Sequence, residues 1–250
     1  VTAQSLNFEL QDSRSVRIKS EDPLGGEVEK SFTITVTDAN DAPTDMTVSQ
    51  LTISENNDPF AVVGDISVTD EDDNDTFTFT IGGVDAASFE VNDSQQLVIK
   101  STADYESQSS YTIDITVQDV GGTGLTYQEN FTIQVVNKNE VATDISLDNN
   151  QINENSALGA DIGNFSVTDE DASDTHSYSF VDGSDNNGLF LIEGNILRLS
   201  GTLNYEAADK HFITIVVTDA GNNEFSKQFQ INVLDVNEAP SAIAISNSTI

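Results

Sequence analysis

The sequence predicts an all-β protein in which β-sandwich repeats with Greek-key connections follow one another in an elongated array. Three observations lead to this fold class. A set of motifs recurs about every 99 residues, which is the size of a domain rather than of a solenoid repeat. Several segments alternate apolar and polar side chains with period 2, as half-buried strands do. Clusters of Gly, Asn and Asp separate these segments, and none of them keeps a helical period.

The repeat is visible in the residues themselves. ISVTDED at residues 66–72 returns as FSVTDED at 165–171, and TISEN at 52–56 returns as QINEN at 151–155, both shifted by 99. DANDAP at 38–43 has counterparts in NKNEVA at 137–142 and DVNEAP at 235–240. This register predicts the last part of one repeat at 1–41, whole repeats at 42–140 and 141–238, and the start of a further repeat at 239–250.

The alternating segments predict the individual strands. They are residues 31–36, 77–81, 111–117, 131–135 and 229–233, each bounded by turn-forming residues such as Gly82-Gly83 and Asn92-Asp93. The hydrophobic fraction of 37% is enough for folded cores, so the high charge does not indicate disorder. Because Cys and Trp are both absent, the Cys…Trp…Cys pattern of antibody-type immunoglobulin domains is excluded.

Composition excludes several classes of function. The chain has 43 Asp and Glu against 9 Lys and Arg, a formal net charge of −34, so it would repel nucleic acid and anionic membrane surfaces. The lack of Cys excludes disulfides and thiolate chemistry. The two histidines, His176 and His211, leave little material for a His-based metal site, and we expect both at ordinary exposed strand positions. No apolar run reaches the roughly 18 residues of a membrane-spanning segment.

The acids that recur point to a hard cation. Each whole repeat has a Glu after its first apolar strand, a DxD motif with another Asp five residues after its first member, an acid- or Asn-x-Glu motif, an Asp at the end of a strand, and an acidic linker. Two carboxylates separated by one residue can face one ion, and a ligand set rich in Asp, Glu and Asn favours Ca²⁺. An EF-hand is excluded, because its required Gly and Glu would be Asp75 and Ile81.

With these motifs the chain resembles the cadherin family, and its DYE, NDAP and NEAP motifs without Cys are similar to the cadherin-like repeats of bacterial surface proteins. The resemblance implies Ca²⁺ bound between successive repeats, with ligands from both. For the first junction it implies Asn7, Glu9, Asp38, Asn40 and Asp41 with Asp70, Asp72, Asp75 and Asp119. For the second it implies Glu55, Asp104, Glu106, Asn137, Asn139 and Glu140 with Asp169, Asp171, Asp174 and Asp219. For the third it implies Glu154, Asn204, Glu206, Asp235, Asn237 and Glu238.

Some positions depart from the family pattern. Asn7 and Asn204 stand where an acid is usual, and the middle linker has Asn137, Lys138 and Glu140. These changes remove charge or lengthen the reach of a ligand, so we expect one ion in an affected junction to be weak or missing.

The resemblance implies an extracellular or cell-surface protein: a calcium-rigidified stalk, filament segment or adhesin of a membrane-anchored parent protein. Its expected partners are neighbouring repeats of the same array, with a homophilic or surface-glycan partner in addition. One alternative is a module that recognises a polysaccharide or a protein, although the absence of Trp disfavours a sugar site. A remoter alternative is a carboxylate-based glycosidase. We expect no enzyme, because no acid–base pair stands outside the repeat pattern.

Overall fold

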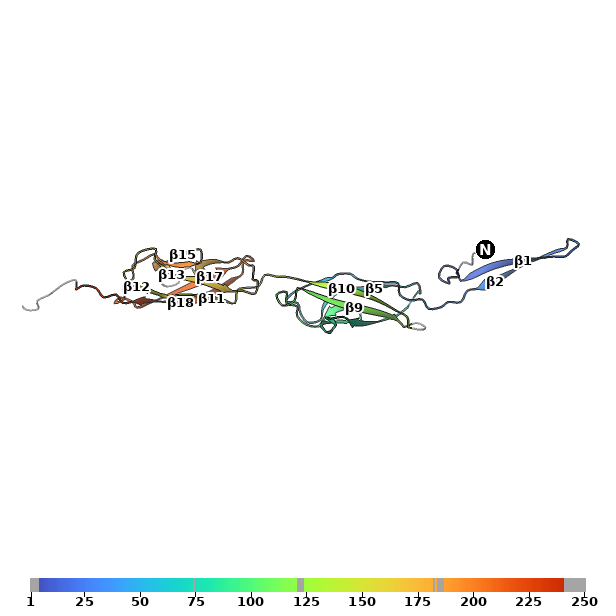
Figure 1. The fold of residues 1–250 in the computed structure, drawn as a ribbon, viewed down its shortest axis with the longest axis horizontal. Helices are drawn as coiled ribbons and strands as arrows, with labels where there is room; N and C mark the ends of the chain where they lie inside the picture. Colours follow the sequence, from blue (N-terminus) through green and yellow to red (C-terminus); the bar gives the residue numbers. More distant parts are fainter. Residues whose placement is uncertain (1–4, 74, 121–123, 182, 184–186, 241–250) are drawn as a thin grey trace, which may run out of the picture. The chain divides into compact units, whose positions relative to one another are not determined.

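The computed structural model describes residues 5–73, 75–120, 124–181, 183 and 187–240 (Figure 1). The chain divides into two units, Val1–Lys138 and Asn139–Ile250, and each is described by itself. Among the described residues, the regular elements are strands, as the sequence predicts, apart from the 3-10 turns Ala86–Ser88 and Asn187–Leu189. Within the described residues, the structure has no helix with the length and apolarity that a membrane span requires.

The first unit contains one complete sandwich of two four-stranded sheets. One sheet has the order β4-β10-β9-β6, and the other has the order β3-β5-β8-β7. The strands are β3 (Asp45–Val48), β4 (Thr52–Ser54), β5 (Ala61–Thr69), β6 (Phe77–Gly82), β7 (Phe89–Val91), β8 (Gln96–Ile99), β9 (Ser110–Asp119) and β10 (Thr126–Val136).

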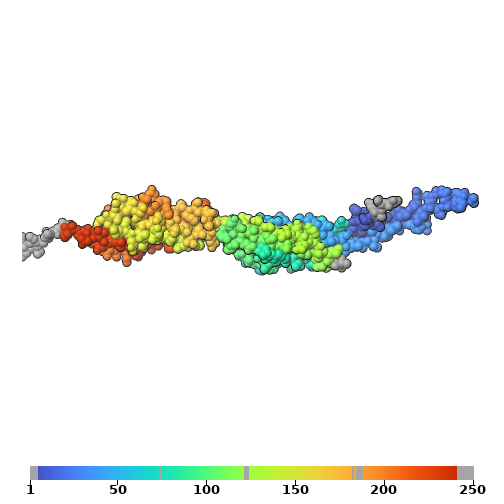
Figure 2. All heavy atoms as spheres, in the orientation of Figure 1, coloured from blue at the N-terminus to red at the C-terminus, as the bar shows by residue number. Residues whose placement is uncertain are grey.

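The first unit also contains a hairpin of β1 (Ser13–Glu21) and β2 (Glu27–Thr35), which is a two-stranded layer exposed along most of its length (blue in Figure 2). Val16 lies opposite Phe32 in the hairpin, just as Ile113 lies opposite Phe131 in the sandwich. The hairpin therefore has the strand register of the last two strands of a repeat.

The second unit repeats the sandwich. Its sheets have the orders β12-β18-β17-β14 and β11-β13-β16-β15. The strands are β11 (Asp144–Leu147), β12 (Gln151–Asn153), β13 (Asp161–Thr168), β14 (Ser177–Phe180), β15 (Phe190–Glu193), β16 (Ile196–Leu199), β17 (Lys210–Thr218) and β18 (Glu224–Leu234). All five segments predicted as strands lie in strands of the structure, with residue 36 just beyond the end of β2.

One parallel pairing in each sandwich positions the acidic sites. β4 runs parallel to β10, and β12 runs parallel to β18, whereas the other strand pairs are antiparallel. The last strand of each repeat therefore ends beside the end of β4 or β12. Glu55 and Glu154 follow these short strands directly, so each glutamate sits where the linker leaves its sandwich.

The cores follow from the period-2 alternation. Along β9 every second side chain is buried, from Tyr111 to Val117, and the same phase buries Ile213, Ile215 and Val217 along β17. Burial of an aliphatic side chain of this size stabilises the fold by about 1.5–3 kcal/mol, which makes these central strands the main source of stability.

The expected exposure of the histidines is wrong. His211 is 8% exposed and packs edge-on against Phe190, as Tyr111 packs against Phe89 in the other sandwich. Burial lowers the pKa of the His211 imidazole, so it stays neutral more readily than an exposed histidine. His176 is only half-buried, and its side chain belongs to an acidic cluster described below.

Candidate calcium sites

A buried glutamate fixes the start of each linker. In the first unit, Glu55 accepts a hydrogen bond from the Lys138 backbone N–H at 2.6 Å and another from the Tyr105 N–H at 2.7 Å, one on each carboxylate oxygen. Only 2% of Glu55 is exposed, and a carboxylate is tolerated in such a place only when it is well hydrogen-bonded. The recurring Glu thus joins the linker to the acid-x-Glu turn.

The second unit repeats this arrangement. Glu154 accepts hydrogen bonds from the N–H groups of Val236 and Tyr205, both at 2.9 Å. These two bonds hold the pKa of Glu154 below its usual value. Beside it, four predicted ligands offer carboxylate oxygens that all lie within 4.8 Å of one another: Glu154, Glu206, Asp235 and Glu238. Asn237 lies in the same exposed linker.

The first residue of the acid-x-Glu motif caps a turn. Asp104 accepts hydrogen bonds from the Ser107 N–H at 2.8 Å and from its hydroxyl at 2.7 Å, and these bonds lower the pKa of Asp104. Asn204 accepts one from Ala207 N–H at 2.7 Å, and Asn7 accepts one from Leu10 N–H at 2.8 Å. An amide oxygen caps this turn as an acid does, which explains how Asn replaces Asp here without loss of the local fold.

The DxD motifs face inward as the alternation predicts. Asp70 and Asp72 are half-buried while Glu71 between them is exposed, and Asp169, Asp171 and Glu170 repeat the pattern. In each motif the second Asp donates its N–H to the first, at 3.2 Å for Asp72 and 3.1 Å for Asp171. This local turn directs both carboxylates to one side.

The linker of the first unit lies against its DxD motif. The Asp41 N–H donates to Asp72 at 2.6 Å, and the Asn40 side-chain amide donates to Asp119 at 3.1 Å. Glu9, Asp38 and Asp72 bring carboxylate oxygens within 4.8 Å of one another. A cavity of about 790 Å³ lies here, and its lining includes Glu9, Asp38, Asn40, Asp72 and Asp75. These contacts bring together most of the ligands predicted for the first junction.

Several carboxylate oxygens in this cluster are buried without a hydrogen-bond donor. They are one oxygen each of Asp70, Asp75 and Asp119, and Asp119 is only 1% exposed. Burial, followed by repulsion from Asp72 and Asp70, raises the pKa of Asp75. Burial and repulsion from Asp72 likewise raise the pKa of Asp41. Hard anionic oxygens that lack donors and repel one another fit the requirements of Ca²⁺.

The second unit contains the equivalent cluster, in which the backbone contact of the linker is the same but the side-chain contact of its Asn goes to a different aspartate. The Glu140 N–H donates to Asp171 at 2.9 Å, and the Asn139 side chain donates to Asp174 at 2.7 Å. Asn223 contributes an additional contact, donating to Asp219 at 2.9 Å and to Asn139 at 2.8 Å through its side chain. In the first unit, the N–H of Asp119 donates to the carbonyl of Leu125, as that of Asp219 donates to Asn223. The leucine side chain has no hydrogen-bond donor.

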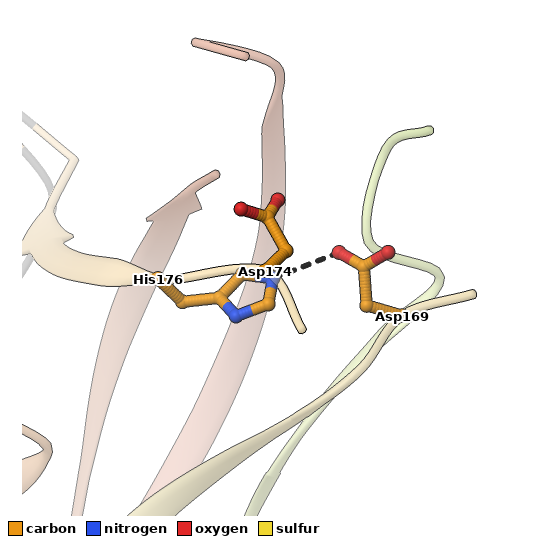
Figure 3. Close-up of side chains that lie close together, drawn as sticks. All are labelled: Asp169, Asp174 and His176. Atoms are coloured by element: carbon orange, nitrogen blue, oxygen red, sulfur yellow. Dashed lines mark hydrogen bonds and ion pairs between the residues drawn. The ribbon is translucent and has the colours of Figure 1, made fainter. Parts of the chain in front are cut away.

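His176 completes this second cluster. Its Nε2 atom lies 2.8 Å from an oxygen of Asp169 (Figure 3). Although burial raises the pKa of Asp174, hydrogen bonds from Thr175, Asn139 and Ala220 together hold it below the usual value. Sequence reasoning missed both His176 and Asn223. The available signal was the difference between repeats, because the position of His176 in the first repeat is Phe77.

Asn137 is the linker residue that precedes Lys138, and it belongs to the first unit. Its side chain donates a hydrogen bond to Glu106 at 2.9 Å. The ligands predicted for the second junction thus fall into two sets. Glu55, Asp104, Glu106 and Asn137 belong to the first unit, and Asn139, Glu140, Asp169, Asp171, Asp174 and Asp219 belong to the second.

Comparison with known proteins agrees with this fold. Residues 49–136 match the family model of the cadherin domain. The chain is 25% identical over 258 residues to protocadherin gamma-A2 of Pan troglodytes, covering 96% of this chain and 28% of that protein. The chain therefore spans little more than a quarter of the length of this relative.

Solved structures of cadherin repeats are also similar. The extracellular cadherin domains 1–5 of protocadherin gamma B2 match with a TM-score of 0.69 and 19% identity, covering 93% of this chain and 48% of that one. Domains 1–4 of protocadherin gamma B7 match with a TM-score of 0.68 and 25% identity, covering 92% and 59%.

These relatives are cadherins rather than glycosidases, in agreement with the expectation that the chain is not an enzyme. Being protocadherins, they give no support to the closer resemblance to bacterial surface proteins. The strand topology and the comparisons together show a fold of tandem cadherin-like β-sandwiches.

Proposed function

We propose that this chain is a calcium-rigidified segment of an extracellular cadherin-like array that serves as a stalk, filament segment or adhesin at the cell surface. The observation that carries the proposal is the set of buried carboxylate oxygens of Asp70, Asp75 and Asp119 that lack a donor. An uncompensated buried carboxylate is costly, and a divalent cation removes that cost. The extracellular location rests on the similar proteins, whose structures are of extracellular domains.

The residues of the first unit would hold Ca²⁺ between the linker and the DxD loop. Glu9, Asp38, Asn40 and Asp41 would supply oxygens from one side, and Asp70, Asp72, Asp75 and Asp119 would supply them from the other. When bound, the ion supplies positive charge that offsets the repulsion among these carboxylates. Because binding requires the docked arrangement, its free energy also stabilises that arrangement.

The other predicted sets extend the proposal. The cadherin resemblance assigns Glu55, Asp104, Glu106, Asn137, Asn139, Glu140, Asp169, Asp171, Asp174 and Asp219 to one junction, and Glu154, Asn204, Glu206, Asp235, Asn237 and Glu238 to the next. The repeat boundaries at 41/42, 140/141 and 238/239 are part of this proposal. So is the weaker occupancy expected where Asn replaces an acid.

A matched pair of variants tests the ion site. Asp119→Asn keeps the shape of the side chain but removes its charge, and it should weaken Ca²⁺ binding at least tenfold in calorimetry. Asp65→Asn is the control, because Asp65 is exposed on β5, outside the predicted ligand set, and accepts a hydrogen bond from the Gln96 side chain. Equal Ca²⁺ affinity in the two variants would contradict the assignment.

Stiffening of the array by Ca²⁺ requires a test separate from the test of ion binding. Adding a chelator should increase protease cleavage at residues 38–41 and shorten the average dimensions in small-angle scattering. Unchanged scattering and cleavage with and without Ca²⁺ would show that metal does not stiffen the array, even if ions bind.

Self-association is a second candidate function. One similar structure, of protocadherin gamma B7 domains 3–6, is described as a cis-dimer. We propose neighbouring repeats and further copies of the chain as partners, tested by Ca²⁺-dependent aggregation of beads coated with it. Beads that stay dispersed in Ca²⁺ would contradict self-association and leave the structural role as the proposed function. The hypothesis of a bacterial surface protein rests on motif style alone.

A further inference from the structure

The two sandwiches differ at one position beside the DxD motif. Both have two aspartates at equivalent places, Asp70 and Asp75 in the first and Asp169 and Asp174 in the second. Two residues after the second aspartate, the first repeat has Phe77 and the second has His176. The second cluster therefore has an imidazole nitrogen as well as carboxylate oxygens.

The side chains of the second cluster are already close together. Asp169, Asp174 and His176 each offer one ligand atom, and these three atoms lie within 4.8 Å of one another. Figure 3 shows the ring nitrogen pointing at Asp169, with the carboxylate of Asp174 beside it. The side chains of His176 and Asp169 are 14% and 5% exposed, so the group is shielded yet reachable.

Neighbouring groups hold both carboxylates in place. One oxygen of Asp169 accepts the Asp171 N–H at 3.1 Å, which leaves the other facing His176. Asp174 accepts the Thr175 N–H at 2.6 Å and the Asn139 side chain at 2.7 Å. Such supporting hydrogen bonds orient the ligands of metal sites and reduce the cost of ordering them.

We propose that Asp169, Asp174 and His176 form a site for a borderline divalent transition-metal ion, of which Zn²⁺ is the representative. Imidazole nitrogen is a good ligand for Zn²⁺ and its neighbours, whereas Ca²⁺ takes oxygen ligands. Ligand bonds of about 2.0–2.2 Å in tetrahedral geometry put the ligand atoms about 3.4 Å apart. The 2.8 Å contact between His176 and Asp169 therefore needs to open only slightly. Water would complete the coordination.

The site is distinct in chemistry from the Ca²⁺ sites, although Asp169 and Asp174 are common to both proposals. If the calcium proposal fails and this one holds, Zn²⁺ binds while Ca²⁺ does not. If His176 has only a structural role and merely hydrogen-bonds Asp169, the chain shows no specific Zn²⁺ binding.

Two reciprocal variants of the whole chain test the site. His176→Phe installs the residue of the first repeat, and Phe77→His installs the imidazole beside Asp70 and Asp75. In calorimetry with Zn²⁺, the unmodified chain should bind one ion at this site. The His176→Phe variant should lose at least tenfold in Zn²⁺ affinity while its Ca²⁺ affinity changes less than threefold. The Phe77→His variant should gain a second Zn²⁺.

NMR of the histidine rings provides an independent readout. The chain has only two histidines, so His211, buried in the core, serves as the internal reference. Zn²⁺ should shift the His176 ring nitrogens and leave those of His211 unchanged. Unmoved His176 signals, unaltered Zn²⁺ affinity in His176→Phe, or an equal loss of Zn²⁺ and Ca²⁺ affinity in that variant would each overturn the proposal.

Discussion

The DxD clusters of the two sandwiches have the same acids but different neighbours. In the first unit, Asp70, Asp75 and Asp119 each have a buried oxygen without a donor. In the second, His176 contacts Asp169, Thr175 and Asn139 donate to Asp174, and Asn223 donates to Asp219. The same motif can therefore depend on a cation in one repeat and be largely satisfied by protein groups in the next.

Removal of Ca²⁺ should produce the largest difference in local stability between the two clusters. At a Ca²⁺ concentration 100 times Kd, binding contributes about 2.7 kcal/mol, which is roughly a 100-fold change in local opening. We expect chelation to reduce hydrogen-exchange protection around residues 70–75 by about that factor. Residues 169–174 should lose far less. Equal losses in the two segments, measured by mass spectrometry, would remove the distinction.

The glutamates after β4 and β12, by contrast, should behave alike. Glu55→Ala leaves the N–H groups of Lys138 and Tyr105 without their acceptor, which should cost about 2 kcal/mol in urea unfolding. Glu154→Ala should destabilise the second unit in the same direction. Glu90→Ala is a control on β7, where the side chain is exposed and lies outside the motifs. A variant of Glu55 as stable as this control would show that the linker contact is not structural.

Replacing the extra donor should make the second cluster resemble the first. Asn223→Leu installs the residue type of Leu125 and removes the side-chain bonds to Asp219 and Asn139. We expect a loss of about 1 kcal/mol without metal and a larger stabilisation by Ca²⁺ than in the unmodified chain. Thermal unfolding with and without Ca²⁺ measures both. Loss of stability without a greater response to Ca²⁺ would contradict the comparison.

Acidification without metal should have opposite effects through Asp75 of the first unit and through Asp174 and Glu154 of the second. The pKa of Asp75 is raised, so the folded state binds its proton more tightly than the unfolded chain and gains stability as the pH falls through that pKa. The pKa values of Asp174 and Glu154 are lowered, so their contribution is present above the pKa values of the unfolded chain and is lost as the pH falls through the lower folded values. Carboxyl-carbon NMR titration measures both midpoints, and a midpoint for Asp75 at or below that of Asp174 would refute the directions.

The sequence alone was sufficient to predict the structural features that are local or that recur between the repeats. Period-2 alternation located the strands, and the 99-residue shift identified the acids of each cluster. Even the burial of His211 was available, because it lies in the same alternating phase as Ile213 and Ile215 on β17. The alternation was a better guide there than the usual polarity of histidine.

The features that the sequence did not predict depend on contacts between segments far apart in the chain or on differences between the repeats. The parallel pairing of β12 with β18 joins residues about 80 positions apart, which no local pattern encodes. Asn223 meets Asn139 across 84 positions. His176 and Asn223 have no residue of the same type at the equivalent position of the other repeat, so recurring motifs do not include them.

The parallel pairing also has a mechanical consequence. Gln134, Val135 and Val136 lie beside Thr52, Ile53 and Ser54, and the Glu55 N–H donates to Val136 at 3.1 Å. A force that pulls the chain from the two sides of this repeat draws β4 and β10 past each other along their length. Their hydrogen bonds must then break together rather than one at a time, so the junction that holds the acidic linker also resists tension.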